Sequence, residues 1–435
     1  MSFTKGQEKA YVYMQCGYNV FLSGEAGTGK SYVLHQFINE KRNEKKNVLV
    51  CAPSGIAAIL VSGVTIHRAF QAPCEPIIRP PKKLPQTVEE ADILVIDEIS
   101  MCRIDLFDYV AQMVEKANKR RRKSGKMPIQ VIVVGDFCQL PPVLVDKEKE
   151  ILDEYYGEDI GNAYAFQSKY WEKFHFKNIV LKDIVRQKDM SFVKALNQAR
   201  MGDAQCVGFF NENSASYPMK NGIYIYSTNR KVKELNAKEL GKIDSPLWEF
   251  EAREDGIVSE TDRMTDKILK LKVGARVMML TNDIENKWQN GTLGTIFNIR
   301  SEEIKVRLDN GKDVSISPYA WSIERYVVVE QMVGKEAVKV LEKEEIGTFE
   351  QFPLKLAYAI TMHKSQGQTY EEANISPAAW APGQLYVALS RVKDINRMYF
   401  LSDVQRRYLL TALEVKEFYQ KIEMEGEQIS LDLRM

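Results

Sequence analysis

Short apolar runs without polar alternation recur in the first third of the chain. They span residues 19–23, 47–54, 92–97 and 129–136. Uninterrupted apolar runs of this length are typical of strands that are buried on both faces of a parallel sheet. Helical patterns separate the runs, so the alternation predicts an α/β domain over about the first 180 residues.

The same rhythm returns later in the chain, at residues 222–229, 369–377 and 397–402, and predicts a second α/β domain. Between these parts, over roughly 256–351, the apolar period changes to two. Residues 304–308 alternate apolar and basic side chains, and Asn-Gly pairs at 290–291 and 310–311 are typical hairpin turns. This segment is therefore predicted to be a small antiparallel barrel inserted in the second domain.

Two shorter segments break the pattern. Residues 72–85 hold five of the fifteen prolines, which excludes a helix there. Residues 119–126 read KRRRKSGK and are either a solvated basic loop or a nucleic-acid contact. The sequence alone does not decide between these two interpretations.

Composition places the chain among ordinary globular proteins. It has 435 residues, 45 % hydrophobic and 27 % charged, which at about 150 residues per domain suggests about three domains. The formal net charge is +1, so a polyanion would have to be held by local patches. No apolar run approaches the ~18 residues of a membrane span, and no export signal precedes the first apolar run, so we expect a cytoplasmic protein. Six scattered cysteines and four distant histidines argue against disulfides and a structural zinc site.

The clearest motif is GEAGTGKS at residues 24–31, which lies between a predicted strand and a predicted helix. This is the context of a phosphate-binding loop, in which backbone N–H groups and the helix N-terminus cradle phosphate oxygens. The cradle would be formed by Gly24, Gly27, Thr28 and Gly29. We expect Lys30 to reach the β- and γ-phosphates of a nucleotide and the Ser31 hydroxyl to bind Mg²⁺.

Acidic and amide side chains follow the neighbouring predicted strands. Asp97 ends an apolar run, where a second Mg²⁺ contact is expected, and Glu98 is placed to polarise an attacking water. A water-activating carboxylate favours hydrolysis over transfer to a substrate hydroxyl. Gln139, after the next strand, could sense the γ-phosphate or the water.

Seven segments together resemble the superfamily-one helicases and match the Pif-type DNA helicases closely. In chain order they are GEAGTGKS, APSGIAA (52–58), TIHRAF (65–70), VIDEIS (95–100), GDFCQLPPV (135–143), TMHKSQGQT (361–369) and YVALSRV (386–392). The resemblance covers residues 1 to about 415. It implies two RecA-like parallel-sheet P-loop domains of the α/β class, with a small β-barrel (SH3-like) insertion in the second.

The resemblance also implies domain bounds. The first RecA-like domain would span 1–182 and include a small wedge-like insertion at 63–86. The second would combine 183–255 with 352–420, around an SH3-like domain at 256–351, and leave 421–435 as a tail.

Further site residues are implied by the same resemblance. Gln7 would recognise adenine, although a lone glutamine near the N-terminus is by itself more often a surface residue, and Gly367 would contact the nucleotide. Arg186 and Arg391 would be the arginines that reach the γ-phosphate from the second domain, as rigid forked cations suit its charge. The residues implied to contact DNA are Ser54, Gly55, Thr65, His67, Phe70, Thr228, Asn229, His363, Lys364 and Ser365. Phe70 is either a stacking residue or a core aromatic.

The implied activity is that of an ATP-dependent DNA helicase that moves 5′ to 3′ on single-stranded DNA, in replication, recombination or repair. Its implied cofactors are ATP and Mg²⁺. Its implied partners are single-stranded DNA and tailed or forked duplexes, with R-loops and G-quadruplexes as further substrates, and we expect a monomer that DNA could dimerise. The proline-rich 72–85 would serve as the wedge.

Three other functions fit the sequence less well. A GTPase would carry N-K-x-D, whereas the nearest string, NGKD at 310–313, has the wrong order. A passive single-strand-binding module would not need Glu98 or Arg391, and ATPase activity stimulated by single-stranded DNA would separate it from a motor. A nuclease-fused recombination subunit would need a further carboxylate cluster, which we do not find.

Overall fold

The computed structural model describes residues 3–184, 187, 189–283, 285–333 and 336–432. Two compact units divide the chain, and each is built from segments that are distant in sequence. The first unit comprises Met1–Arg186, Glu324–Glu344 and Thr411–Met435; the second comprises Gln187–Ile323 and Glu345–Leu410. No helix in the described part of the chain has the length and apolar character needed to cross a membrane.

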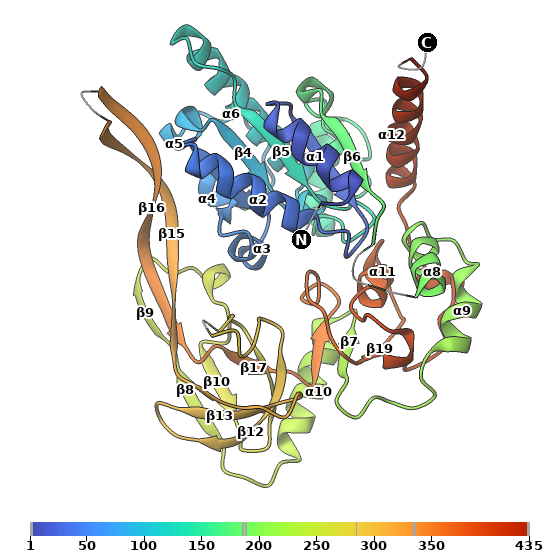
Figure 1. Cartoon of the computed structure of the whole chain (residues 1–435). Helices are drawn as coiled ribbons and strands as arrows, with labels where there is room; N and C mark the ends of the chain where they lie inside the picture. The colour runs from blue at the N-terminus through green and yellow to red at the C-terminus, as the bar shows by residue number, and fades with distance from the viewer. Residues whose placement is uncertain (1–2, 185–186, 188, 284, 334–335, 433–435) are drawn as a thin grey trace. The chain divides into compact units, whose positions relative to one another are not determined.

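The first unit is built on a six-stranded sheet in which all neighbouring strands are parallel (Figure 1). In spatial order its strands are β3 (Val64–Thr65), β2 (Val48–Ala52), β4 (Ile93–Ile96), β5 (Gln130–Val134), β1 (Val20–Gly24) and β6 (Lys177–Leu181). Every residue of β1, β2 and β4 is buried, as the uninterrupted apolar runs predicted. The four strands predicted in this part of the chain are thus confirmed.

Helices cover both faces of this sheet. On one face, α1 (Lys5–Gln15) and α2 (Lys30–Asn43) pack against β1 through a core that includes Phe37 and Leu22. Because alternate strand residues point to opposite faces, Phe21 lies on the other side and contacts Trp171. Phe107 of α6 (Ile104–Lys123) packs against the same tryptophan.

The remaining short elements of the first unit lie in its loops. The helices are α3 (Gly55–Leu60), α4 (Ile66–Phe70), α5 (Gln86–Glu90) and α7 (Asp146–Tyr156), and the 3₁₀ turns are η1 (Ile99–Met101), η2 (Ala165–Gln167) and η3 (Glu172–Phe174). Residues 72–85 form no helix or strand, as their prolines predicted. This loop is tied to α6, because the Ile77 N–H donates to Asp105 (2.7 Å) and Arg103 donates to the Glu75 carbonyl (3.2 Å).

The second unit contains a four-stranded parallel sheet. Its order is β18 (Ala359–Thr361), β7 (Ile223–Tyr226), β19 (Ala373–Ile375) and β20 (Met398–Phe400), which confirms the second predicted α/β region. Its helices are α8 (Met190–Arg200), α9 (Cys206–Asn213), α10 (Asn229–Gly241) and α11 (Gln384–Leu389), with 3₁₀ turns η5 (Ile395–Arg397) and η6 (Arg406–Tyr408).

The predicted antiparallel insertion is present and has its own core. Five strands pair in the order β14 (Asp313–Ile316), β13 (Ile304–Leu308), β12 (Leu293–Ile299), β11 (Arg276–Met279) and β17 (Leu354–Leu356). A two-stranded sheet joins β10 (Ile268–Leu271) to β8 (Trp248–Glu251), and η4 (Glu260–Asp262) precedes β10. The insertion therefore extends beyond the predicted 256–351 at both ends, because β8 and β17 pair with strands inside it.

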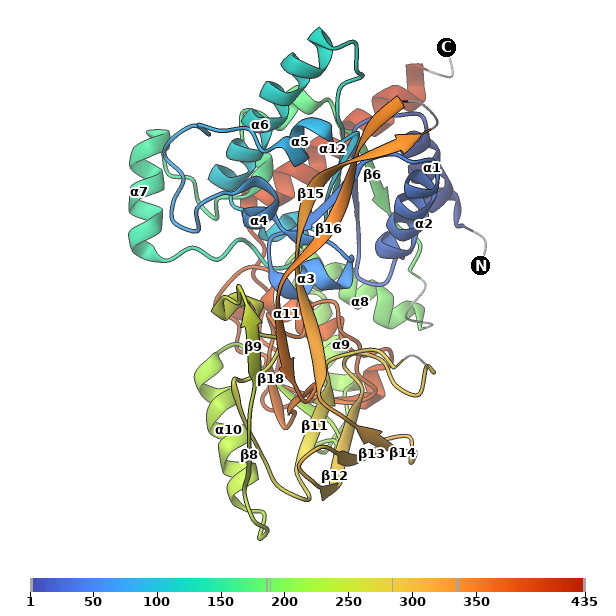
Figure 2. The same ribbon diagram turned by 90° about the vertical axis from the view of Figure 1, so that its left-hand side faces the viewer.

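Two long strands, β15 (Tyr319–Val333) and β16 (Glu336–Gln351), form a twisted ribbon whose base pairs with β9 (Arg253–Gly256) (Figure 2). The outer part of this ribbon, Glu324–Glu344, belongs to the first unit. There the Tyr326 hydroxyl accepts from the Val50 N–H (3.4 Å), and the Asn47 side chain donates to the Lys339 carbonyl (3.0 Å). The predicted bounds placed this whole ribbon in the inserted domain.

The last helix, α12 (Leu413–Asp432), also belongs to the first unit. Its Phe418 stacks on Phe166 with ring centroids 4.3 Å apart and contacts Phe21, Phe137 and Trp171. The predicted bounds split this segment at 420 and gave its first part to the second domain. Long-range aromatic packing places it with the first unit instead.

Candidate nucleotide and nucleic-acid sites

The GEAGTGKS segment forms the turn between β1 and α2. Gly24 ends the strand, and α2 begins at Lys30 after Gly29, which has φ 80°. A side chain at Gly24 would place its Cβ 2.7 Å from the Leu181 carbonyl oxygen, and at Gly29 2.5 Å from the Gln7 amide nitrogen. Both positions therefore need glycine, so that the loop can pass close to β6 and to α1.

The Lys30 side chain folds back over the phosphate loop. Its ammonium group donates to the carbonyls of Gly24 (2.7 Å) and Glu25 (3.0 Å). Thr28 is buried and its hydroxyl donates to the Glu25 carbonyl (2.9 Å), which shapes the turn, whereas Ser31 is exposed in the first turn of α2. A helix N-terminus with a lysine at its first residue is an anion-binding arrangement.

Gln7 is not a surface residue: its exposed fraction is 4 %. Its side-chain amide donates to the Thr28 carbonyl (2.9 Å), and its side-chain oxygen accepts from the Thr4 N–H at the start of α1 (3.0 Å). A capping box therefore fixes the glutamine against the phosphate loop. The predicted glutamine does lie beside the predicted nucleotide site.

Asp97 and Glu98 follow β4 at the carboxyl edge of the same sheet. Burial raises the pKa of Asp97 to about 6, although the Glu98 N–H and the positive charge of Lys30 both lower it. The Glu98 N–H donates to the Asp97 carboxylate (2.9 Å), and Glu98 itself has φ 50°. A left-handed conformation costs a non-glycine residue about 1 kcal/mol or more, and such strain clusters at functional sites.

Gln139 follows β5 in a tight turn that Asp136 organises. The Gln139 N–H donates to the Asp136 carbonyl (2.9 Å), and the Cys138 N–H donates to the Asp136 carboxylate (3.1 Å). Asp136 is fully buried, and Gln139 is buried as well. The sequence analysis assigned no role to Asp136. Its position at a strand end was the available signal, but such strand-end turns are common.

In the second unit, Arg391 is 1 % exposed at the end of α11. Its guanidinium donates to the carbonyls of Val387 (2.7 Å), Ser365 (3.2 Å) and Gln368 (3.2 Å). The arginine therefore joins the ALSRV segment to the HKSQGQT segment, in which Gly367 has φ 77°. The second predicted arginine, Arg186, lies outside the described residues.

The residues predicted to contact DNA in the first unit divide into two kinds. Ser54 follows β2 and Thr65 is the last residue of β3. Their hydroxyls cap the short helices α3 and α4, accepting from the Ala57 N–H and the Arg68 N–H (both 3.3 Å), and Gly55 is the first residue of α3. His67 is partly exposed, and burial together with the charge of Arg103 lowers its pKa, which favours the neutral imidazole. Phe70, by contrast, is 0 % exposed, so it is the core aromatic of the two alternatives.

In the second unit, Thr228 and Asn229 lie at the start of α10, and His363 and Lys364 follow β18. Burial lowers the pKa of His363, while Lys364 is exposed. Ser365 is fully buried and its hydroxyl donates to the Met362 carbonyl (2.7 Å). Its side chain therefore supports the segment and is not available to a phosphate, which corrects the prediction.

A further cation, Lys355, lies close enough to Lys364 to feel its charge. Lys355 lies on β17, and burial together with the positive charge of Lys364 lowers its pKa to about 8. Its sequence context, a lysine between two leucines, gave no signal beyond a strand pattern.

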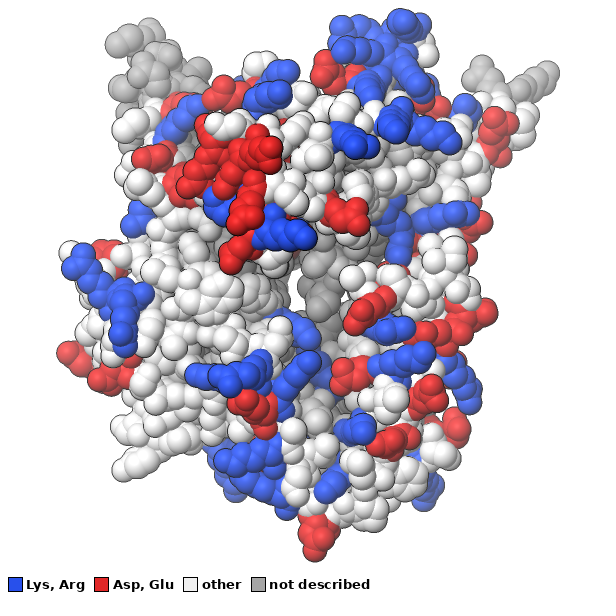
Figure 3. All heavy atoms as spheres, turned by 180° about the vertical axis from the view of Figure 1, so that it is seen from behind, with Lys and Arg blue, Asp and Glu red and all other residues white. Residues whose placement is uncertain are grey.

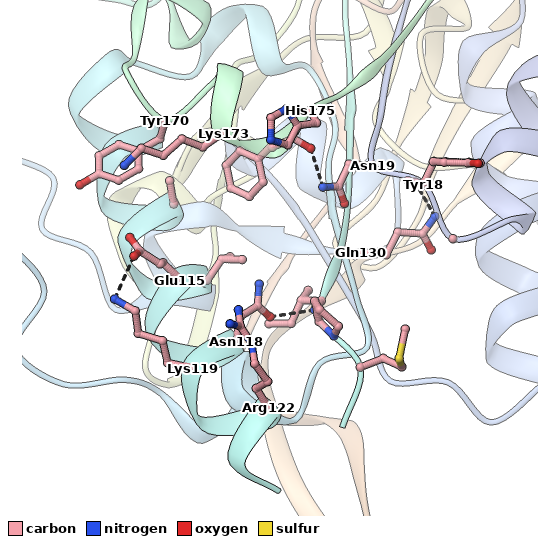
Figure 4. A pocket seen from close by; sticks show the side chains of 17 residues that line it. Tyr18, Asn19, Glu115, Asn118, Lys119, Arg122, Gln130, Tyr170, Lys173 and His175 are labelled. Atoms are coloured by element: carbon pink, nitrogen blue, oxygen red, sulfur yellow. Dashed lines mark hydrogen bonds and ion pairs between the residues drawn. The ribbon is translucent and has the colours of Figure 1, made fainter. Parts of the chain in front are cut away.

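A cavity of about 730 Å³ lies at the opposite end of the first sheet from the phosphate loop (Figure 4). Tyr18 and Asn19 before β1 line it, together with Gln130 at the start of β5. Its cationic lining residues include Lys119 and Arg122 near the end of α6, where lysines and arginines gather at the top of Figure 3. Because phosphates bind at the carboxyl ends of parallel strands, this cavity is not the nucleotide site.

The chain is similar to known ATP-dependent DNA helicases. A family profile described as PIF1-like helicase matches residues 4–204. The ATP-dependent DNA helicase Pif1 of Campylobacter jejuni is 30 % identical over 93 % of this chain and 94 % of that protein, and the Pif1 of Bdellovibrio bacteriovorus is 30 % identical over 96 % and 91 %.

Solved structures give the same result. Bacteroides sp Pif1 in complex with ADP-AlF4 matches with a TM-score of 0.82 and 32 % identity, over 98 % of both chains. Bacteroides Pif1 bound to ssDNA matches with a TM-score of 0.69 over the same shares. The resemblance inferred from the motifs is confirmed: the chain belongs to the PIF1-like helicase family.

Proposed function

We propose that this protein is an ATP-dependent DNA helicase that moves 5′ to 3′ along single-stranded DNA. The observation that carries the proposal is the cluster at the carboxyl edge of the first sheet, where Lys30, Asp97 and Gln139 follow neighbouring parallel strands. Relatives that match this chain over more than nine tenths of their own length are named ATP-dependent DNA helicases, and Bacteroides Pif1 has been solved with ADP-AlF4 and with ssDNA. These observations favour a motor over a passive single-strand-binding module.

The donors present suit Mg²⁺. In the described part of the chain no three His, Cys, Asp or Glu side chains are grouped to hold a metal ion, so a dedicated protein cage is absent there. Mg²⁺ is commonly held by one or two side-chain oxygens together with phosphates and water, and here the Ser31 hydroxyl and the Asp97 carboxylate would hold it. When bound, it would neutralise charge on the phosphate oxygens.

In this proposal different residues of the chain have separate roles in ATP hydrolysis. The phosphate loop and Lys30 bind the nucleotide, and Gln7 orients the loop and the base. Glu98 accepts a proton from the attacking water at its carboxylate, and Gln139 holds that water against the γ-phosphate. Arg391 would stabilise the charge that develops on the γ-phosphoryl oxygens, and Arg186 is proposed for the same role.

DNA would be held mainly through its backbone. Ser54, Gly55, Thr65, Thr228 and Asn229 offer hydroxyls, an amide and strand-end N–H groups, which suit phosphates without reading sequence. His67 is partly exposed and its lowered pKa favours the neutral imidazole, so it can stack on a base, and Lys364 adds positive charge.

The proline-rich loop 72–85 is proposed as the wedge that separates the strands. A solved structure that concerns unwinding of forked dsDNA by two coordinating Pif1 helicases supports forked duplexes as substrates and a DNA-induced dimer in this proposal. R-loops and G-quadruplexes, roles in replication, recombination or repair, and a cytoplasmic location are part of the same proposal.

The direction of movement is tested by unwinding under single-turnover conditions. We expect duplexes with a 5′ single-stranded tail to open, and duplexes with a 3′ tail or blunt ends to stay closed, because a 5′-to-3′ motor loads only on the 5′ tail. The readout is the fraction of labelled strand released by excess enzyme with a trap for free protein. Opening of the 3′-tailed duplex alone would overturn the direction and leave the ATPase proposal standing.

The pKa of Lys355 gives a second test. A lysine with a pKa of about 8 is charged below that pH and neutral above it, so its attraction for phosphate is lost as pH rises through 8. We expect affinity for an oligo-dA strand to fall roughly 3- to 10-fold between pH 7 and pH 9 at fixed salt. Lys355→Arg should flatten this dependence, because arginine stays charged throughout. Equal pH dependence in the two proteins would exclude Lys355 from the DNA surface.

A further inference from the structure

The hydroxyl of Tyr419, on α12, is buried among groups at the carboxyl edge of the first sheet. The tyrosine is 5 % exposed. Its oxygen lies 2.6 Å from the Ser23 hydroxyl and 3.2 Å from the Asp136 carboxylate, and the Phe137 N–H donates to it at 3.1 Å. Tyr419, on the last helix, therefore contacts residues at the ends of both β1 and β5.

The three contacts assign a role to each partner of this hydroxyl. A tyrosine hydroxyl has one hydrogen to donate and two lone pairs to accept with. The carboxylate of Asp136 accepts only, and the Phe137 N–H donates only. The hydrogen of Tyr419 therefore goes to Asp136, and the Ser23 hydroxyl donates to Tyr419. A buried hydroxyl with three partners of fixed roles holds those partners in one arrangement.

Each partner leads directly to the proposed nucleotide site. Ser23 precedes Gly24, whose carbonyl accepts from the Lys30 ammonium group at 2.7 Å. The Asp136 carboxylate accepts from the Cys138 N–H at 3.1 Å, and the backbone carbonyl of Asp136 accepts from the Gln139 N–H at 2.9 Å, so Asp136 fixes the turn that carries Gln139. The tyrosine is one hydrogen bond away from both segments.

The helix that carries Tyr419 is anchored by other contacts. Phe418 stacks on Phe166, and Glu414 accepts from the Asn162 side chain at 2.8 Å. The Tyr419 ring also contacts Phe418, with centroids 5.7 Å apart. Phenylalanine at 419 would keep this packing and remove only the hydroxyl, so the function of the hydroxyl can be measured separately from docking of the helix.

We propose that Tyr419 is a positioning residue for ATP hydrolysis, which acts through Asp136 on Gln139 and through Ser23 on the phosphate loop. This inference rests on the proposed ATPase function. Small displacements of a group that orients the reacting water lower the rate of the chemical step, while the contacts that bind the nucleotide are kept. The hydroxyl therefore affects kcat more than KM.

The test is Tyr419→Phe in the full chain, assayed for ATP turnover with saturating single-stranded DNA. We expect kcat to fall about 10-fold, with KM for ATP changed less than twofold and a thermal unfolding midpoint close to that of the unaltered protein. Asp136→Asn should lower kcat too, and the double variant should lose less than the product of the two effects, because both act through one hydrogen bond.

Tyr164→Phe is the matched control. Tyr164 is fully buried, its ring stacks on Phe166 with centroids 5.2 Å apart, and within the described residues its hydroxyl has no hydrogen-bond partner. We expect its kcat to be unchanged. An unchanged kcat for Tyr419→Phe, or an equal loss in Tyr164→Phe, would overturn the positioning role alone. Absence of DNA-stimulated turnover in the unaltered protein would overturn the proposed function, and the positioning role with it.

Discussion

Alanine in place of Lys30 is expected to lower ATP turnover by roughly 100- to 1000-fold, the loss typical of removing one positioned donor from a site of developing charge. In the structure the lysine ammonium lies on the loop carbonyls of Gly24 and Glu25, within reach of any phosphate that enters the loop. Its alanine variant would keep the backbone N–H groups but lose the mobile cation. The measurement is steady-state phosphate release with saturating single-stranded DNA.

The same variant should bind single-stranded DNA with near-normal affinity, since none of the proposed DNA contacts involves Lys30. Lys45→Ala provides a control, because Lys45 lies in the turn after α2, away from the loop. Turnover should not change in the control. A folded Lys30→Ala protein that hydrolyses ATP at more than about a tenth of the normal rate would contradict the assignment of the phosphate loop.

Replacing Glu98 by glutamine is expected to lower turnover by about 100- to 10,000-fold, the range that general-base catalysis contributes. Glutamine has nearly the same shape, so the left-handed backbone at this position and the N–H bond to Asp97 should be kept. What is lost is the capacity to take up a proton. ATP binding should persist, and the protein should accumulate in the ATP-bound state.

Two measurements check the Glu98 prediction. Filter binding of labelled ATP should show near-normal affinity, and single-turnover hydrolysis should be slow. Glu75→Gln is a suitable control, because Glu75 is an exposed residue of the proline-rich loop. If Glu98→Gln retained normal single-turnover rates, another group would have to activate the water.

The strands that could be predicted from the sequence are those whose amino-acid composition reflects their burial. β1, β2 and β4 are buried at every position, so their composition alone identifies them. β6 lies at the sheet edge with only two of its five residues buried, and β3 has two residues, so neither gave a readable pattern. Strand β8 is exposed or half-buried throughout and was missed for the same reason.

The candidate site was predictable where motif residues follow strand ends, because topology then brings them together. Lys30, Asp97 and Gln139 are of this kind. Motif membership did not tell which side chains point outward, so Phe70 and Ser365 were assigned to DNA although both are buried. The contact of Tyr419 with Ser23 could not be predicted, because the two residues are 396 positions apart and no motif surrounds the tyrosine.

The position of α12 in the first unit has a consequence for how the protein is made. When the ribosome has added residue 186, all six strands of the sheet have been synthesised, but the helix that covers Phe21, Phe137 and Trp171 begins 227 residues later, at Leu413. At about 5–20 residues per second, that delay is roughly 10 to 45 s. During this time Phe21, Phe137 and Trp171 lack the ring contacts that α12 supplies, so the nascent first unit has an incomplete aromatic core.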